Sequence, residues 1–301
     1  MLSKEESIMK NFVIGAIAGC GAVTVSNPMD CAKTRLQLQG ELRRAGEYKK
    51  VFNGVIDTVV KTYTHEGVAG LQKGLITAYV FQVIMNGLRL GIYESSKRYR
   101  PEKYQKSAIL NLFTGLFSGF TGGVVASPFQ LIKTRQQSNS FAAERYKYNY
   151  KGIWEALTLI YGAEGFKGLY HGALAFGLRT AMAGGAQLST YDMCKHFATD
   201  NLGLKDDQFV YLASSLVATA SASLVMSPFD VVSTRLYNQK YSNAGSGELY
   251  KGPIDCMIKI VKIEGPLGLY KGFTAVWGRL APHSILFLMF SEQLKGLFAK
   301  Y

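Results

Sequence analysis

The sequence predicts an all-α membrane protein with six transmembrane helices, arranged as three tandem repeats around a pseudo-threefold axis. The first observation is a proline-centred segment that recurs every 100 residues, at Pro28, Pro128 and Pro228, and ends each time in Thr-Arg. The second is a set of apolar stretches that approach or exceed the ~20 residues a helix needs to cross a bilayer. Recurrence of one unit at a fixed period is typical of repeat architectures.

Further marks keep the same register in each repeat. A Glu-Gly pair follows each proline and leads to a second glycine, at Gly74, Gly172 and Gly272. An acid followed three residues later by lysine closes each repeat. We expect a single transmembrane domain over residues 1–301, with repeats of approximately 8–103, 104–203 and 204–301.

The first helix of each repeat is predicted by residues 11–29, 107–132 and 208–229, which carry no charged side chain. The second helix of each repeat is less obvious, because a single arginine interrupts each stretch. These stretches are residues 74–97, 172–195 and 272–295, and the arginines are Arg89, Arg179 and Arg279. Charges at such depth are costly unless they face protein or water, so we expect the arginines to line a water-filled central cavity.

A short amphipathic helix separates the two spans of each repeat. Apolar residues recur at helical spacing over 53–63, 153–160 and 254–261. We expect these helices to lie along one membrane surface.

The overall composition narrows the possible functions. The chain has 301 residues, a net charge of +13 and a mean hydropathy of +0.06. Such a basic balance favours anionic partners, but the Lys and Arg are spread over loops and helix ends rather than gathered in a nucleic-acid module. The four cysteines lie far apart without metal-ligand spacing, and residues 1–10 lack the apolar core of a cleavable signal. We therefore expect no nucleic-acid partner, metal or cofactor.

The motifs resemble those of the mitochondrial carrier family over essentially the whole chain. The shared patterns are P-x-[DE]-x-x-[KR]-x-[KR] and [DE]-G-x-x-x-x-[YWF]-[KR]-G. The resemblance implies the mitochondrial inner membrane, both termini in the intermembrane space, surface helices in the matrix, and alternating access between two gates. Residues 89–94 and 279–283 are similar to the dicarboxylate, oxoglutarate and uncoupling branch, and residues 70–75 and 249–256 to fungal oxaloacetate carriers.

The resemblance also implies two gates made of ion pairs between neighbouring repeats. The matrix gate would pair Asp30 with Lys133, Gln130 with Ser233, and Asp230 with Lys33. The second of these pairs has lost both charges, which avoids an uncompensated buried ion. The cytoplasmic gate would pair Glu94 with Lys195, Asp192 with Lys295, and Glu292 with Lys97. The residues placed to brace the matrix gate are Gln37, Gln137 and Tyr237.

Between the gates, two arginines predict an anion site. Arg179 and Arg279 each precede a cytoplasmic-gate acid by thirteen residues, roughly 20 Å along a helix. Two guanidinium forks at one level suit two carboxylates, or a compact divalent anion such as sulfate. The alternative is that an arginine pairs with a cavity acid, although the stretches around it offer few acids. The other candidate substrate contacts are Phe81, Gln82, Arg89, Thr180, Gln187 and His283.

Several of these candidates keep a second interpretation. His283 lies one turn beyond Arg279 and could carry a proton, or it could pack and donate one hydrogen bond. Phe81 and Gln82 could shape the substrate site or pack between helices. The glycines that open helices could bind phosphate through exposed amides or could form turns only. The resemblance implies cardiolipin at those glycines, which are Gly54, Gly74, Gly152, Gly172, Gly252 and Gly272.

The function expected from the sequence is transport of oxaloacetate and related dicarboxylates by a monomer, with malonate and sulfate as further substrates. One alternative is another dicarboxylate or oxoglutarate exchanger, or an uncoupling-type proton leak. Another alternative is a membrane scaffold that transports nothing. We do not expect an enzyme, because no nucleophile–base pair or nucleotide-binding loop is evident in the sequence.

Overall fold

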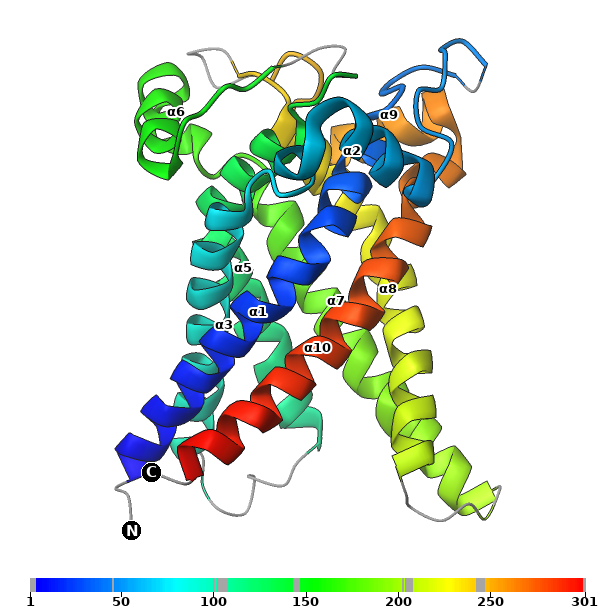
Figure 1. Ribbon diagram of the computed structural model, residues 1–301. Coiled ribbons are helices and arrows are strands. Elements are labelled where there is room, and N and C mark those ends of the chain that lie inside the picture. The colour runs from blue at the N-terminus through cyan, green and yellow to red at the C-terminus, as the bar shows by residue number, and fades with distance from the viewer. Residues whose placement is uncertain are drawn as a thin grey trace.

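The computed structural model describes residues 4–44, 46–99, 101, 108–142, 147–201, 203, 208–241 and 247–299. Within them the chain forms helices and connecting loops, and no strand beyond an isolated bridge. Figure 1 shows the long helices side by side in one bundle. These helices are α1 (Lys4–Leu38), α3 (Leu75–Arg98), α5 (Ala108–Ser138), α7 (Ala173–His196), α8 (Gln208–Asn238) and α10 (Phe273–Ala299).

Shorter helices gather at one end of the bundle (Figure 1). They are α2 (Val55–Leu71), α6 (Ile153–Gly168) and α9 (Pro253–Glu264). The 3-10 turn η2 (Pro266–Tyr270) follows α9. The opposite end holds both chain termini and the π-helical turn η1 (Phe197–Asn201). We call these the surface-helix end and the terminal end. The predicted all-α fold of three repeats, each with a surface helix, is confirmed.

Four of the described helical segments are long and apolar enough to cross a membrane: Phe12–Leu38, Leu110–Ser138, Val210–Asn238 and Pro266–Leu294. A fifth span results if α2 and the adjoining part of α3, which meet at a bend of 58°, count together. Helix α7 has the same length as α3 but does not meet this criterion. It contains Arg179 and several glycines and polar residues, as expected of a helix that lines an aqueous cavity.

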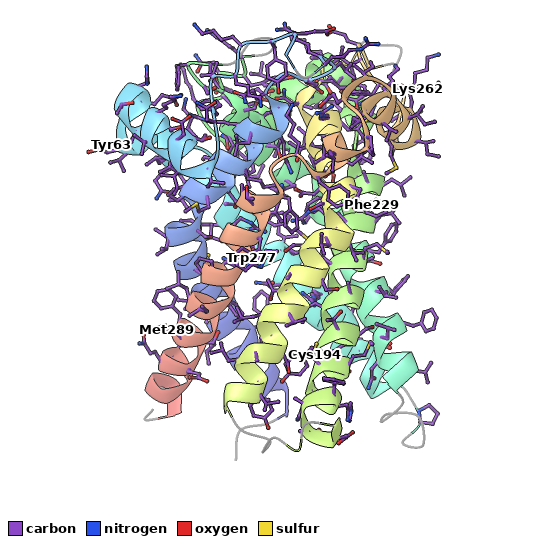
Figure 2. The ribbon with its side chains drawn as sticks, turned by 90° about the vertical axis from the view of Figure 1, so that its right-hand side faces the viewer. Tyr63, Cys194, Phe229, Lys262, Trp277 and Met289 are labelled. Carbon is purple, nitrogen blue, oxygen red and sulfur yellow. The ribbon has the colours of Figure 1, made fainter. Side chains whose placement is uncertain are left out.

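The distribution of side chains is that of a membrane protein. Large apolar residues project outward along the stem, among them Val25, Trp277 and Met289, which are 57%, 44% and 50% exposed. Figure 2 shows Trp277 and Met289 along α10, and polar side chains concentrated towards the surface-helix end. The largest fully buried side chains include Arg135 and Arg235, near this end. The polar interior therefore lies where the helices converge under the surface helices.

Glycine fixes the turns that carry each surface helix into the next span. Gly67, Gly165 and Gly265, the second residues of the Glu-Gly pairs, have φ of 68°, 69° and 84°. L-residues with a side chain rarely adopt this left-handed region, whereas glycine does so without steric cost. Each surface helix thus changes direction at this glycine. The three prolines lie inside continuous helices, where the missing backbone donor of proline predicts a kink.

Candidate functional site

The site begins at Asp30, on the buried face of α1. Its Oδ2 accepts a hydrogen bond from Lys133 Nζ on α5 at 2.7 Å. Its Oδ1 lies 3.0 Å from Arg279 Nε on α10, an ion-pair distance. We call these three residues the first charged sector. Its members come from three different repeats.

The second charged sector repeats this arrangement around Asp230 on α8. Lys33 Nζ on α1 donates to Asp230 Oδ1 at 2.8 Å, and Arg179 Nε on α7 donates to the same oxygen at 2.5 Å. Gln37 Nε2 donates to Oδ2 at 2.7 Å, the bracing position predicted for it. Both ion pairs expected between lysine and aspartate are therefore present in the structure.

The two charged sectors form a buried layer across the interior, which we call the inner layer. The side chains of Asp30 and Asp230 are only 7% and 3% exposed, and those of Lys33 and Lys133 are 8% exposed. Removing one partner from such a buried pair typically costs about 3–5 kcal/mol, because a charge is left without compensation. Every ion pair in this layer joins one repeat to another. The inner layer therefore holds the three repeats together.

The third sector of the pseudo-threefold arrangement contains no charge. Gln130 and Ser233 occupy the positions of the aspartate and the lysine, and Phe81 occupies that of the arginine. Gln130 Nε2 donates to Thr134 at 3.5 Å and Ser233 donates to the Asp230 carbonyl at 3.0 Å, each within its own helix. The neutral contact expected between Gln130 and Ser233 is therefore not among the hydrogen bonds of the described residues. We call Phe81, Gln130 and Ser233 the neutral sector.

Few acids were expected near Arg179 and Arg279, but each of these arginines lies beside an aspartate. Arg179 and Arg279 do not stand apart from the gate: each shares an aspartate with a gate lysine. Arg179 also lies with its guanidinium carbon 5.2 Å from the centre of the Phe176 ring. Their side chains are 13% and 15% exposed, more than those of the lysines. The predicted anion site and the predicted gate are thus one cluster.

Arg89 stands apart from this cluster, on α3. It is exposed, and no ion pair or hydrogen bond involving its side chain is found within the described chain. It faces α7, where a Cβ added to Gly184 would lie 3.9 Å from Arg89 Nη2. Gln187, its repeat equivalent, is also exposed. Arg89 is therefore a cation available to an anion that approaches from the terminal end.

Four other candidates lie in helix contacts instead. Gln82 packs against α1, where a Cβ at Gly19 would come within 2.9 Å of its Cγ. Thr180 donates to the Gly119 carbonyl of α5 at 2.7 Å. His283 Nδ1 lies 3.2 Å from Ser26 Oγ on α1. Phe81 packs edge-to-face on Phe176, with ring centres 5.8 Å apart. For these residues the packing interpretation fits the structure better.

The predicted gate at the terminal end is only partly described. Asp192 and Glu292 are exposed, and Lys195 Nζ lies 4.8 Å from the centre of the Tyr211 ring. The side chains of Glu94, Lys97 and Lys295 lie outside the described residues. The pairings proposed at this end remain predictions.

A second, outer layer of ion pairs was not predicted. The arginine that ends each proline segment pairs with the glutamate of the Glu-Gly motif in the same repeat. The contacts are Arg35–Glu66 at 2.8 Å, Arg135–Glu164 at 2.7 Å and Arg235–Glu264 at 2.5 Å. The recurrence of both residues in all three repeats was the signal that could have revealed these pairs. We call them the outer layer.

A third residue lies beside the glutamate of each outer ion pair. Lys73 lies 2.7 Å from Glu66, and Lys271 lies 3.5 Å from Glu264. In the second repeat the equivalent residue is His171, whose Nδ1 lies 3.8 Å from Glu164. The His171 ring stacks on Tyr241 with ring centres 3.5 Å apart. The arginine–glutamate pair is therefore present in all three repeats, whereas His171 is too far from Glu164 for a hydrogen bond and adds a charge only when protonated.

The remaining two bracing residues do not contact a charged sector. Gln137 accepts from Thr34 at 3.1 Å and donates to Asn27 at 3.2 Å. The Tyr237 hydroxyl pairs with Ser127 at 2.8 Å. Gln137 instead links α5 to α1, and the third sector has no ion pair for Tyr237 to brace. Only Gln37 acts as predicted.

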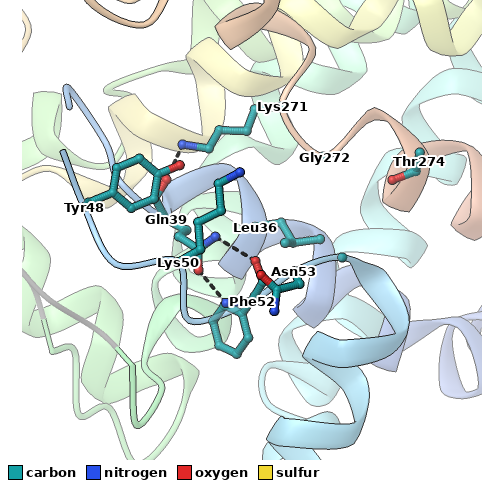
Figure 3. Close-up of a pocket in the computed structure, with 10 residues that line it drawn as sticks. Leu36, Gln39, Tyr48, Lys50, Phe52, Asn53, Lys271, Gly272 and Thr274 are labelled. Atoms are coloured by element: carbon teal, nitrogen blue, oxygen red, sulfur yellow. Dashed lines mark hydrogen bonds between the residues drawn. The ribbon is translucent and has the colours of Figure 1, made fainter. Parts of the chain in front are cut away.

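A cavity of about 240 Å³ opens between the first and third repeats at the surface-helix end. Its wall includes Lys50, Lys271, Gly54 and Gly272, two of the predicted lipid-binding glycines. Lys271 lies over the Tyr48 ring, 5.3 Å from its centre, and donates to the Gln39 carbonyl (Figure 3). Helices α2 and α10 begin directly after Gly54 and Gly272. Two lysines and two helix N-termini suit an anionic group.

Comparison with known proteins decides the family. A family model described as mitochondrial carrier protein matches the chain three times, over residues 4–104, 104–202 and 205–301. The chain belongs to the mitochondrial carrier family. With its membrane-spanning helices, this assigns it to the mitochondrial inner membrane.

Curated relatives resemble the chain over nearly its full length. The mitochondrial oxaloacetate transport protein of Saccharomyces cerevisiae is 42% identical over 95% of this chain and 89% of its own. The protein of the same name in Schizosaccharomyces pombe is 40% identical, over 97% and 92%. The mitochondrial citrate transporter E of Aspergillus niger is also 40% identical, over 94% and 91%. Identity at this level is shared by relatives named for different carboxylates.

Proposed function

We propose that this carrier transports oxaloacetate and related dicarboxylates across the inner membrane by alternating access. The observation that carries the proposal is the pairing of Arg179 and Arg279 with the two aspartates of the inner layer. Each guanidinium has donors that a substrate carboxylate could take in place of aspartate. The names of the fungal relatives support oxaloacetate as the first substrate to test.

The arrangement suggests how binding and opening are coupled. A dicarboxylate that enters from the terminal end meets Arg89 first. Its two carboxylates then replace those of Asp30 and Asp230 as partners of the deeper arginines. The contacts that Arg179 and Arg279 make between repeats are thereby broken, which removes part of what holds the inner layer closed. The substrate thus binds best when the layer is partly broken, which is how differential binding lowers a barrier. Malonate and sulfate remain further candidates.

The lipid partner is part of the same proposal. We assign the cavity beside Gly54 and Gly272 to a cardiolipin phosphate, because its wall offers two lysines and the amides of two helix starts. By repeat symmetry, equivalent contacts are proposed at Gly74 with Gly152, and at Gly172 with Gly252. The surface-helix end then faces the matrix.

Uptake into liposomes tests the transport proposal. The purified carrier is reconstituted and offered labelled oxaloacetate, malonate, malate, oxoglutarate and sulfate. Arg279→Ala should reduce dicarboxylate uptake more than tenfold, and Arg279→Lys should recover part of it because lysine keeps the charge without the fork. Asp57, whose side chain is 32% exposed, pairs with Lys61 one turn away and accepts from the Asn53 amide, which an asparagine oxygen can also do. Asp57→Asn therefore supplies a control that should leave uptake unchanged. Folded Arg279→Ala with wild-type uptake would refute the role of this arginine, and proton conduction without anion uptake would favour the uncoupling alternative.

A further inference from the structure

The neutral sector is the feature that dicarboxylate transport leaves unexplained. Its three positions have lost their charges together, although Phe81, Gln130 and Ser233 lie in three different repeats. In the two other sectors the equivalent positions hold an arginine, an aspartate and a lysine. A change confined to one residue would have left a buried charge without its partner. The loss therefore acts on the sector as a unit.

The sectors differ in the charge that they offer a substrate. Each charged sector combines one carboxylate with two cations, so it carries a single net positive charge. The neutral sector carries none. The inner layer therefore offers two positive charges, and each of them includes a guanidinium group that can bind a carboxylate through two parallel hydrogen bonds.

We propose that the neutral sector sets the charge of the substrate: it admits anions with two carboxylates and rejects those with a third at this level. This inference rests on the proposed transport function and adds the basis of its selectivity. A third carboxylate would lie against Phe81, whose ring packs edge-to-face on Phe176. Ser233 donates within its own helix and Gln130 Nε2 makes one 3.5 Å bond to Thr134, so the sector offers a third carboxylate no cation and no donor beyond a neutral amide N–H. A desolvated carboxylate without a donor is strongly disfavoured.

Arg89 does not compensate for the missing charge. It lies eight residues beyond Phe81 on α3, which is about 12 Å along the helix axis. The carboxylates of a compact tricarboxylate are much closer together than this. The Arg89 guanidinium lies beside Gly184, nearer the terminal end than Arg179, so it belongs to another level and is not part of the neutral sector.

Wild-type carrier provides the first test. Two inhibitors of labelled oxaloacetate uptake are compared near neutral pH: propane-1,2,3-tricarboxylate and 3-carbamoylpentanedioate, in which an amide replaces the central carboxylate. The two have nearly the same shape and differ by one charge. We expect the tricarboxylate to inhibit about tenfold less strongly or weaker still, a factor equal to 1.4 kcal/mol. Equal inhibition would overturn the proposal. Absence of oxaloacetate uptake would instead refute the proposed function, before any inhibitor is added.

A gain of charge provides the second test. The variant Phe81→Arg/Gln130→Asp/Ser233→Lys gives the neutral sector the residues of the other two, and the matched control Gln130→Asp/Ser233→Lys adds no net charge. We expect the ratio of citrate uptake to oxaloacetate uptake to rise about tenfold in the triple variant and to stay constant in the control. An unchanged ratio in a folded triple variant would overturn the proposal. If the triple variant does not fold, the inhibitor pair decides alone.

Discussion

The inner and outer layers contain the same kinds of ion pair but connect different parts of the chain. Each ion pair of the inner layer joins two repeats, as Lys133 joins Asp30 across a sequence separation of 103 residues. Each ion pair of the outer layer lies within one repeat, as Arg235 joins Glu264 across 29 residues. The outer layer is also complete, whereas the inner layer has lost one of its three sectors.

This difference indicates which contacts persist during transport. Alternating access requires the repeats to move relative to one another, so contacts between repeats must break and contacts within a repeat can stay. Each additional ion pair between repeats stabilises the closed state and raises the barrier to opening. An ion pair within a repeat has no such effect, although outer-layer side chains also bond to the next repeat, as Glu264 does to the Leu42 amide, and those bonds must break as well. The loss of charge from one inner sector and the retention of all three outer pairs follow from this distinction.

The largest expected effect comes from breaking the outer layer. Arg235→Ala leaves Glu264 buried without the two hydrogen bonds that Arg235 donates, at 2.5 and 2.8 Å. We expect a loss of about 3–5 kcal/mol in the free energy of unfolding, seen as a large drop in thermal unfolding temperature in detergent. Asp255→Asn, which removes an exposed pair with Lys259 in the same repeat, should change stability by no more than about 0.5 kcal/mol. Equal stability of the two variants would contradict the structural role of the outer layer.

Breaking the inner layer should affect transport more than folding. Asp30→Asn keeps the size of the side chain but leaves Lys133 and Arg279 without their shared carboxylate. We expect oxaloacetate uptake to fall more than tenfold, and the unfolding temperature to drop as well because two buried cations lose their carboxylate, but the variant should still fold because the outer layer is intact. Uptake in liposomes and thermal unfolding in detergent are measured on the same preparation. If neither Asp30→Asn nor Arg235→Ala gives folded protein, the proposed distinction between the two layers is wrong.

A smaller effect is expected from acid. Burial acts to raise the pKa of Glu264. The hydrogen bonds and charge of Arg235, with Lys271 and the Leu42 amide, outweigh burial and hold this pKa below its ordinary value. Its contribution to stability is therefore complete above the unfolded pKa of about 4.3 and is lost as pH falls through the lower folded pKa. Thermal unfolding should decline over this range, and Glu264→Gln should start lower and decline less steeply. A steeper decline in the variant would contradict this assignment.

Much of the fold could be predicted from the sequence because the repeats mark it three times. The prolines, the Glu-Gly pairs and the arginines within the second span of each repeat fix the register of every helix. The family resemblance, applied in that register, implied the two gate pairs, Asp30 with Lys133 and Asp230 with Lys33. A residue in one repeat thus predicts the position of its equivalents in the others.

The cluster that joins the gate to the arginines could not be predicted in the same way. The spacing of Arg279 from Glu292 gives its height along α10 but not the tilt of α10 against α1. That tilt brings Arg279 within 3.0 Å of Asp30. Side-chain direction is also missing from the sequence, so the helix contacts of Thr180 and Gln82 could not be foreseen, and their contact with substrate stays a prediction.

Restoring the third inner ion pair tests the central claim most directly. Gln130→Asp alone should lower both oxaloacetate uptake and the unfolding temperature, because it buries an unpaired acid. Gln130→Asp/Ser233→Lys should then unfold at a higher temperature than wild type but take up oxaloacetate more slowly, at a rate between those of wild type and the single variant. This opposition of stability and rate is what the account predicts for a contact that must break in each cycle. A double variant that is more stable and also transports at or above the wild-type rate would contradict it.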